Sequence, residues 1–186
     1  MKPILPKIIP ENQGGFIQGR QIVDNYFLVQ EAIHSNLLRK EQGMAIKLDL
    51  ANAFDRVNHS FLLNVMSKFG FGEKFIKWIR ACISEPWIAP LVNGRATEIF
   101  KASRELRQGC PLSPQLFVIQ ASVVNFLLNK RMQDQDIIGL CIARGAKNIN
   151  HALFADDTLL LGPAKISSAS NSKGFWMISV RPQAVL

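Results

Sequence analysis

Apolar and polar positions alternate with a period of two in one segment, and a second segment carries two short apolar runs. In residues 44–50, Ile46, Leu48 and Leu50 alternate with Ala45, Lys47 and Asp49. In residues 152–161 the two runs flank the doublet Asp156-Asp157. Such patterns are typical of β-strands. They predict a strand that ends at Asp49 and a hairpin whose turn holds Asp156-Asp157.

Longer stretches repeat their apolar residues at the spacing of a helix. A long amphipathic helix is predicted from Ile22 to about Arg39, and it should end before Gly43. Three more helices are predicted over residues 61–69, over residues 73–84, and from Ser113 to about Leu128. Ser113 suits the cap of the last helix, and Pro114 suits its first position.

Turn and loop signals separate these elements. Asn93-Gly94, between apolar residues 88–92 and 96–100, is the strongest short hairpin signal of the sequence. Three prolines in residues 1–10 predict an extended or loop-like opening. Residues 130–149 lack a clean period and predict a loop, with a short strand near residues 137–142. Residues 162–186 are expected to be poorly ordered, which leaves residues 1–161 as the predicted domain.

Composition narrows the class of protein. The chain has 186 residues, enough for one domain, and its apolar fraction of 48% is ordinary for a globular protein. No apolar run approaches the roughly 20 residues of a membrane span, and the N-terminus lacks the features of a signal peptide. Cys82, Cys110 and Cys141 lack metal-ligand spacing and are expected to be free thiols. These features predict an intracellular protein with no membrane partner, in the nucleus or the cytoplasm.

The net charge favours a polyanionic partner. The chain carries 22 basic and 14 acidic residues, which gives a formal net charge of +8. A basic chain with clustered acids favours a nucleic acid held by the cations and a metal held by the acids. Charge alone does not decide the matter, because many basic proteins bind no nucleic acid.

Asp156-Asp157 is the first candidate for metal chemistry. Two neighbouring carboxylates at one turn repel each other unless a cation neutralises them, and Mg²⁺ prefers such all-oxygen ligands. The structural alternative is that Asp-Asp is simply good turn chemistry. If the strand ending at Asp49 lies beside this hairpin, three carboxylates converge at one edge of a sheet. Asp55 suits instead an N-terminal position of the next helix, where its charge favours the helix dipole.

Two loops that contain glycine are further candidates for ligand contacts. Residues 11–20 are rich in glycine and amide side chains and end on Arg20, a residue type suited to a phosphate. The alternative is a plain loop with a solvated arginine. Residues 104–114 form a basic loop that leads into the helix predicted from Ser113.

Taken in order, these segments resemble the reverse transcriptase domain of non-LTR (LINE-type) retrotransposons, most closely its plant-like branch. The matching motifs are Glu11-Asn12-Gln13 through Gly19-Arg20, Lys47-Leu48-Asp49 through Ala53-Phe54-Asp55, Leu106-Arg107-Gln108-Gly109 through Phe117, and Phe154-Ala155-Asp156-Asp157. One aspartate doublet is weak evidence. Four ordered motifs spread over residues 2–161 are specific.

The resemblance implies an α+β fold, the palm of a right-hand polymerase. Its antiparallel sheet would have helices packed on one face and the acids on the open face. Part of the fingers would be present, whereas the basic motif that precedes them, the thumb and the endonuclease of complete elements are not recognisable. The implied activity is DNA synthesis from an RNA template, a DNA primer and dNTPs. The alternatives are a catalytically inactive fragment that at most binds nucleic acid and, less favoured, a two-metal nuclease.

The resemblance also implies roles for individual residues. The matches to the family's catalytic, metal-binding carboxylates are Asp49, Asp156 and Asp157. They would hold two Mg²⁺ ions, with Mn²⁺ as an alternative. Lys47 alternates to the side of Asp49 and is interpreted as a solvated lysine.

Four residues match the nucleotide-binding positions of the family. Phe54 matches the aromatic residue beneath the nucleotide sugar, although an ordinary core aromatic is the alternative. Gln108 and Gly109 match the loop that packs along the nascent base pair, and a plain lead-in to the helix is the alternative. Arg20 is matched, less specifically, to a contact with template or triphosphate.

Overall fold

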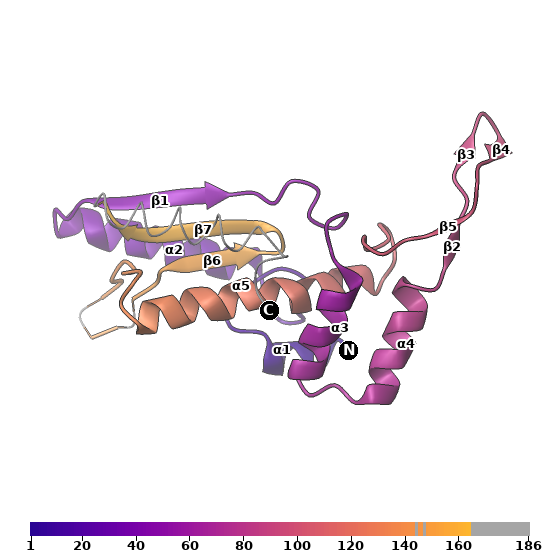
Figure 1. Cartoon of the computed structure of the whole chain (residues 1–186). Helices are drawn as coiled ribbons and strands as arrows, with labels where there is room; N and C mark the ends of the chain where they lie inside the picture. Colours follow the sequence, from indigo (N-terminus) through magenta and orange to yellow (C-terminus); the bar gives the residue numbers. More distant parts are fainter. Residues whose placement is uncertain (144, 147, 165–186) are drawn as a thin grey trace.

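The computed structural model describes residues 1–143, 145–146 and 148–164 of the chain. The helices, shown in Figure 1, are α1 (Leu5–Ile8), α2 (Ile22–Leu38), α3 (His59–Lys68), α4 (Glu73–Ile83) and α5 (Ser113–Gln133). The strands are β1 (Gly43–Leu48), β2 (Trp87–Ile88), β3 (Leu91–Val92), β4 (Arg95–Ala96), β5 (Phe100–Lys101), β6 (His151–Phe154) and β7 (Asp157–Pro163). Helices combined with antiparallel strands confirm the predicted α+β class. Within the described ranges, no helix is long and apolar enough to cross a membrane.

An antiparallel sheet of three strands, in the order β1–β7–β6, forms one end of the molecule (Figure 1). The central strand β7 pairs with β1 from Gly43↔Pro163 to Leu48↔Thr158. It pairs with β6 from His151↔Leu160 to Phe154↔Asp157. The two segments predicted to be strands are therefore neighbours in one sheet.

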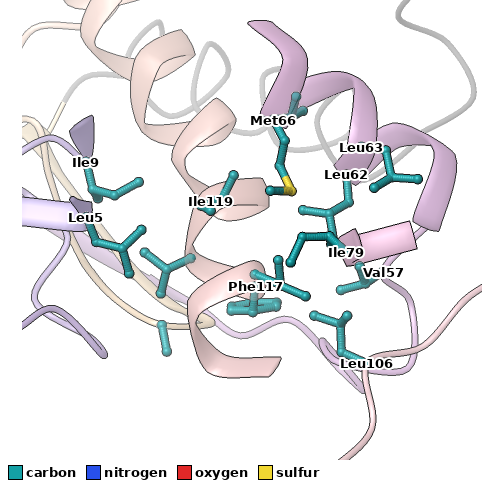
Figure 2. Packing of buried hydrophobic residues seen from close by; sticks show 14 of the residues in the cluster. Leu5, Ile9, Val57, Leu62, Leu63, Met66, Ile79, Leu106, Phe117 and Ile119 are labelled. Carbon is teal, nitrogen blue, oxygen red and sulfur yellow. The ribbon is translucent and has the colours of Figure 1, made fainter. Parts of the chain in front are cut away.

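The main hydrophobic core surrounds the first half of α5. Figure 2 shows Leu62, Met66 and Ile79 on one side of this helix and Leu5 and Ile9 on the other. The most buried side chains of the core come from several segments of the chain: Leu5, Val57, Leu62, Met66, Leu106, Leu116 and Ile119. Burying a large aliphatic side chain of this kind stabilises a fold by about 1.5–3 kcal/mol. This core holds the first half of α5 in place, and the second half of the same helix reaches the sheet.

A smaller cluster joins α5 to one face of the sheet. Leu128 of α5 packs in one cluster with Leu160 of β7, and Ile46 and Leu48 of β1 lie against it. Successive side chains of a strand point to opposite faces, so Lys47, between Ile46 and Leu48, belongs to the other face. The sheet thus has one apolar face covered by α5. Its second face carries Lys47 and Asp157 at one end, whereas further along β7 Leu161 packs in a cluster with Ala32 of α2.

Helix α2 forms as predicted, but its apolar stripe is not turned into the protein. Ala32 and Asn36 are its buried residues, whereas Tyr26, Phe27 and Leu37 are 62%, 62% and 68% exposed. The helix is attached through Val29 and Ala32, which pack in one cluster with Leu140 and Leu161, and also through polar side chains. The Asn25 amide donates to the carbonyl oxygens of Asn12 and Leu153, at 3.1 and 2.9 Å.

Two local predictions were wrong. The opening segment is not extended throughout, because residues 5–8 form α1 and bury Leu5 in the core. Pro6 does not prevent this, since the first turn of a helix needs no N–H there. Ser113 is not the cap of α5. Its hydroxyl donates to the carbonyl oxygen of Arg107 at 2.7 Å, and the cap position belongs to Leu112.

The hairpin at Asn93-Gly94 is confirmed and forms a projecting arm (Figure 1). Both turn residues have positive φ, 51° and 76°. The arm is paired in two short pieces, β3–β4 near the turn and β2–β5 at the base. Near the other predicted strand, Leu140 forms an isolated bridge with Ile149. β7 extends to Pro163, past Leu161, and the expectation of poor order from residue 165 onward lies outside the described residues.

Candidate active site

Three aspartates stand where β1 ends and where β6 turns into β7. Asp49 follows the last residue of β1, Asp156 lies in the turn and Asp157 opens β7. Leu48, the last residue of β1, is paired with Thr158 near the start of β7. Asp49 therefore lies beside the start of β7. All three carboxylates are exposed or half-buried. The sequence predicted that the three aspartates converge if the two strands are neighbours. The strands are neighbours, and the backbone places the three residues at the same end of the sheet.

Lys47 lies among these acids and is not a merely solvated lysine. Its Nζ forms an ion pair with Oδ1 of Asp157 at 3.0 Å. The pKa of Lys47 is raised, first by the hydrogen bond to Asp157 and then by the negative charge of Asp157, with smaller contributions from Asp49 and Asp156. A cation at this place is thus stabilised by all three aspartates.

The chemistry of these side chains fits a hard divalent metal ion. The donors are carboxylate oxygens, the ligand type that Mg²⁺ and Mn²⁺ prefer. The Lys47 ammonium shows that the site attracts a cation. In the part of the chain that the structure describes, however, no three acidic, histidine or cysteine side chains are already arranged as a metal cage. The carboxylate oxygens are thus suitable ligands for Mg²⁺ or Mn²⁺. In this structure, however, Asp157 binds the ammonium of Lys47.

The turn that carries Asp156 is held by a side chain from the other end of the chain. Gln13 is 1% exposed, and its Oε1 accepts hydrogen bonds from the backbone N–H groups of Ala155 and Gly15, at 2.8 and 2.9 Å. Its Nε2 donates to the carbonyl oxygen of Ala155 at 3.3 Å. Ala155 has φ 56°, in the left-handed region that a residue with a Cβ rarely adopts. Gln13 therefore stabilises an uncommon backbone conformation directly before Asp156.

Backbone contacts extend this support along β6. Gly14 donates to the carbonyl oxygen of Leu153, and Leu153 donates to that of Asn12, both at 2.8 Å. A Cβ on Gly15 would lie 2.4 Å from the Ala155 nitrogen, so only glycine fits there. From the sequence, this loop was predicted to contact a ligand, and its support of the turn was not predicted. The feature of the sequence that could have indicated this support is the pair of amide side chains, Asn12-Gln13, followed by two glycines.

Phe54 lies at the margin of the main core. Its ring stacks on that of Phe117 of α5, with 4.7 Å between the ring centroids and 17° between the planes. Its carbonyl oxygen accepts a hydrogen bond from Leu106 at 3.0 Å. The Phe54 side chain packs against the core but is only partly buried, so part of its ring stays accessible to a ligand. Its predicted place beneath a nucleotide sugar stays a prediction.

Gln108 and Gly109 lie in an exposed turn just before α5. Gly109 has φ 80°, and a Cβ built on it would meet no atom within 4 Å. The positive φ therefore explains why glycine is favoured at position 109. No neighbouring atom fills the space beside it. The predicted contact of this loop with a base pair stays a prediction.

Arg20 is engaged by the backbone of its own segment. Its guanidinium donates to the carbonyl oxygens of Pro10 and Ile9, both at 2.7 Å, and to those of Gln13 and Pro6, at 2.9 and 3.2 Å. Burial lowers its pKa, and the charge of Glu11 partly opposes this effect. The contacts bend the chain around the guanidinium and position the loop that carries Gln13. Its predicted contact with template or triphosphate stays a prediction.

Asp55 is not part of the helix that follows. It is exposed in a turn, where its N–H donates to the Asn52 carbonyl oxygen at 3.1 Å. Asn58 caps α3 instead, since its Oδ1 accepts from the N–H of Phe61 at 2.9 Å. The prediction of an N-terminal helical position for Asp55 was wrong, since α3 begins four residues later, at His59.

The arrangement as a whole defines a class of protein. An antiparallel sheet carries acids at the junction of β1 with the β6–β7 turn, and α5 packs on its apolar face. This is the architecture of a polymerase palm. Residues 1–171 match the family described as "Reverse transcriptase (RNA-dependent DNA polymerase)", and the chain belongs to this family. Members of the family generally use divalent metal ions.

Related sequences come from non-LTR retrotransposons. The chain is 29% identical over 164 residues to the transposon TX1 uncharacterized 149 kDa protein of Xenopus laevis, covering 87% of this chain and 12% of that protein. It is also 29% identical over 137 residues to a Pol polyprotein of the type-1 retrotransposable element R2 of Popillia japonica, covering 74% of this chain and 22% of that protein. The chain therefore spans less than a quarter of the length of these two relatives.

Solved structures support the fold. The chain is similar to telomerase from Candida albicans in complex with a fragment of telomeric RNA, with a TM-score of 0.64 and 12% identity. That match covers 90% of this chain and 29% of the telomerase. Apo telomerase from Candida tropicalis, truncated from its C-terminal domain, gives a TM-score of 0.63 and 12% identity, covering 88% and 32% of the two chains. At this identity the likeness concerns the fold alone.

Proposed function

We propose that this chain is the palm of an RNA-directed DNA polymerase that adds nucleotides to a primer 3′-hydroxyl. The observation that carries the proposal is the position of Asp49, Asp156 and Asp157 at one end of the sheet, where the end of β1 pairs with the start of β7. Because the chain belongs to the reverse transcriptase family, we interpret these three acids as the metal ligands of a polymerase.

In the proposed mechanism the three aspartates hold the metal ions, Mg²⁺ or alternatively Mn²⁺. The chemistry that two such ions would supply at these carboxylates is activation of the primer 3′-hydroxyl and neutralisation of charge on the pyrophosphate. Asp156 and Asp157 sit on a turn fixed by Gln13, so their backbone positions are set before any ligand arrives. Asp49 extends from β1, whose pairing with β7 fixes its distance from the turn.

The proposed nucleotide contacts come from two other places. Phe54, stacked on Phe117, would limit the space beneath the sugar of a bound dNTP. Gln108 and Gly109 would lie along the nascent base pair, where the open space beside Gly109 admits a close backbone approach. For Arg20, the four carbonyl contacts favour a role in shaping the loop around Gln13, from which it would influence template or triphosphate indirectly.

The proposed partners are an RNA template, a DNA primer and dNTPs. The net charge of +8 favours a polyanionic partner, and a structurally similar telomerase was solved with RNA. The chain spans 12% and 22% of the two relatives described above. A second candidate is a chain that binds nucleic acid without extending a primer. It is favoured by the contact of Asp157 with Lys47 and by the described acids not being arranged as a metal cage.

Primer extension on an RNA template, with Mg²⁺ and dNTPs, tests the proposal. The unaltered chain is expected to lengthen the primer, and Asp156→Asn is expected to reduce extension to background. Extension that survives Asp156→Asn would contradict the assignment of the acids. A folded chain that shows salt-sensitive binding but no extension would support the second candidate. Shortened primers would indicate a nuclease.

A further inference from the structure

We propose that Lys47 is a built-in counter-cation of the acidic site, a positioning residue that holds the aspartates together without metal and is displaced from Asp157 when metal binds. The inference deepens the proposed function and rests on it. It concerns a residue that has no assigned role in the chemistry.

The register of the sheet places Lys47 where it can play this part. Lys47 is paired with Leu159, and Asp157 lies two residues earlier on β7, on the same face. Diagonal neighbours of this kind are within reach of a long side chain. The resulting distance from Nζ to Oδ1 is 3.0 Å. Strand pairing thus brings the two side chains within reach of each other.

Lys47 and a metal ion compete for the same oxygen atoms. Oδ1 of Asp157 is occupied by the ammonium, and Asp49 and Asp156 add their charges around it. A divalent ion bound by these carboxylates would lie close to the ammonium and be repelled by it. The lysine therefore lowers the affinity of the site for metal while it offsets the mutual repulsion of the acids.

A lysine suits this task because it is easily released. Its side chain is 68% exposed, so the freed ammonium can be hydrated without leaving an unpartnered charge inside the protein. A flexible stem also lets it swing away from Asp157. The lysine can thus keep the acids in place in the absence of metal and leave them when the ion arrives.

Binding of Mn²⁺ in the absence of nucleotide, followed by electron paramagnetic resonance at low ionic strength, tests the inference directly. Lys47→Met should bind Mn²⁺ about threefold to tenfold more tightly than the unaltered chain, because one repelling charge is removed. Lys47→Arg, which keeps the charge, should stay within about twofold of the unaltered chain. The matched control is Lys77→Met on α4, which removes the same charge away from the sheet and should change nothing.

A thermal readout separates positioning from simple charge loss. Without metal, Lys47→Met should unfold at a lower temperature than the unaltered chain, since the acids repel each other unopposed. Mg²⁺ should raise its Tm by more than it raises that of the unaltered chain. Lys77→Met should show the Mg²⁺ response of the unaltered chain.

The outcomes distinguish this inference from the proposed function. If Asp156→Asn weakens Mn²⁺ binding but Lys47→Met leaves it unchanged or weaker, the metal site stands and the role of Lys47 is overturned. If neither the unaltered chain nor Lys47→Met binds Mn²⁺, the proposed metal site fails and the inference fails with it. Binding that is detectable only in Lys47→Met would support the competition most strongly.

Discussion

The two faces of the β1–β7–β6 sheet are built from the same strands and treat charge in opposite ways. On the face toward α5, His151, Leu153, Thr158 and Leu160 are between 0% and 4% exposed. On the other face, the side chains of Lys47 and Asp157 are 68% and 46% exposed and form an ion pair. At the acidic end of β7, neighbouring residues thus differ strongly in exposure, since the Asp157 side chain is partly exposed and Thr158 is buried.

His151 shows what burial does to a titratable group. Burial lowers its pKa to about 4, so the imidazole is neutral at pH 7. Its ring nitrogens lie 2.7 and 2.9 Å from the amides of Asn150 and Asn125. Both partner atoms are Oδ1 oxygens, and a neutral imidazole carries a single N–H, so it donates to only one of them. The buried face keeps a polar group only in its uncharged form.

The comparison explains how one small sheet serves two purposes. The buried face fixes the strands through packing and neutral hydrogen bonds, at a place that water does not reach. The second face keeps full charges at its exposed end, where Lys47 and Asp157 lie, and a metal site requires such charges. The two faces meet at Ala155, where Gln13 fixes the turn.

Removal of an aliphatic side chain should separate the two faces most clearly. Leu160→Ala opens a cavity between β7 and α5 and should lower the free energy of unfolding by about 2–5 kcal/mol. Leu159→Ala, at the next position of the same strand and only partly buried, should cost about 1 kcal/mol. Denaturant unfolding measures both, and equal losses would contradict the assignment of the faces.

The pH dependence of stability should reveal His151. Its pKa is about 4 in the folded chain and about 6.5 when exposed, so the unfolded chain binds the proton more readily in this window. Stability that is fully present above pH 6.5 should fall by roughly 2–3 kcal/mol as the pH approaches 4. Denaturant unfolding at pH 7 and pH 4.5 should show a smaller fall in His151→Gln. An identical fall in both chains would mean that His151 does not titrate in this way.

Gln13→Ala should weaken the junction between the faces. It leaves the buried N–H of Ala155 without its partner and should cost about 1–3 kcal/mol in the free energy of unfolding. Mn²⁺ affinity should also fall, because the turn before Asp156 loses its support. Gln18→Ala, in the same loop region but at an exposed position, is the matched control. A variant with lower stability and unchanged Mn²⁺ affinity would show that the amide supports the fold without positioning the acids.

The acids could be predicted from sequence because their signals are local. Alternation marked the strand before Asp49, and two apolar runs marked the turn at Asp156-Asp157. The helices and the hairpin at Asn93-Gly94 also follow from neighbours in the chain. Pairing of the two predicted strands needed one assumption, which the structure confirms.

What escaped prediction depends on contacts between distant segments. The hydrogen bonds of Gln13 to Ala155 and of Arg20 to four carbonyl groups have no periodic signature. The ion pair of Lys47 needs the register between β1 and β7, which one sequence does not reveal. Helix α2 was predicted as amphipathic, but its attachment through Asn25 leaves Tyr26 and Phe27 exposed. Hydrophobic spacing predicts that a helix forms and does not say which side it presents.

The contact between Gln13 and Ala155 also has a consequence for the order of folding. It closes a loop that contains nearly all of the described chain, and such long closures form late because their entropy cost precedes any gain. During synthesis, α1 and the loop after it must wait for β6 and β7 to leave the ribosome. Until then Leu5, Ile9 and Ile17 lack Ala155, one of the residues that complete their cluster. The contact that supports the acidic turn can thus form only after nearly all of the described chain has been synthesised.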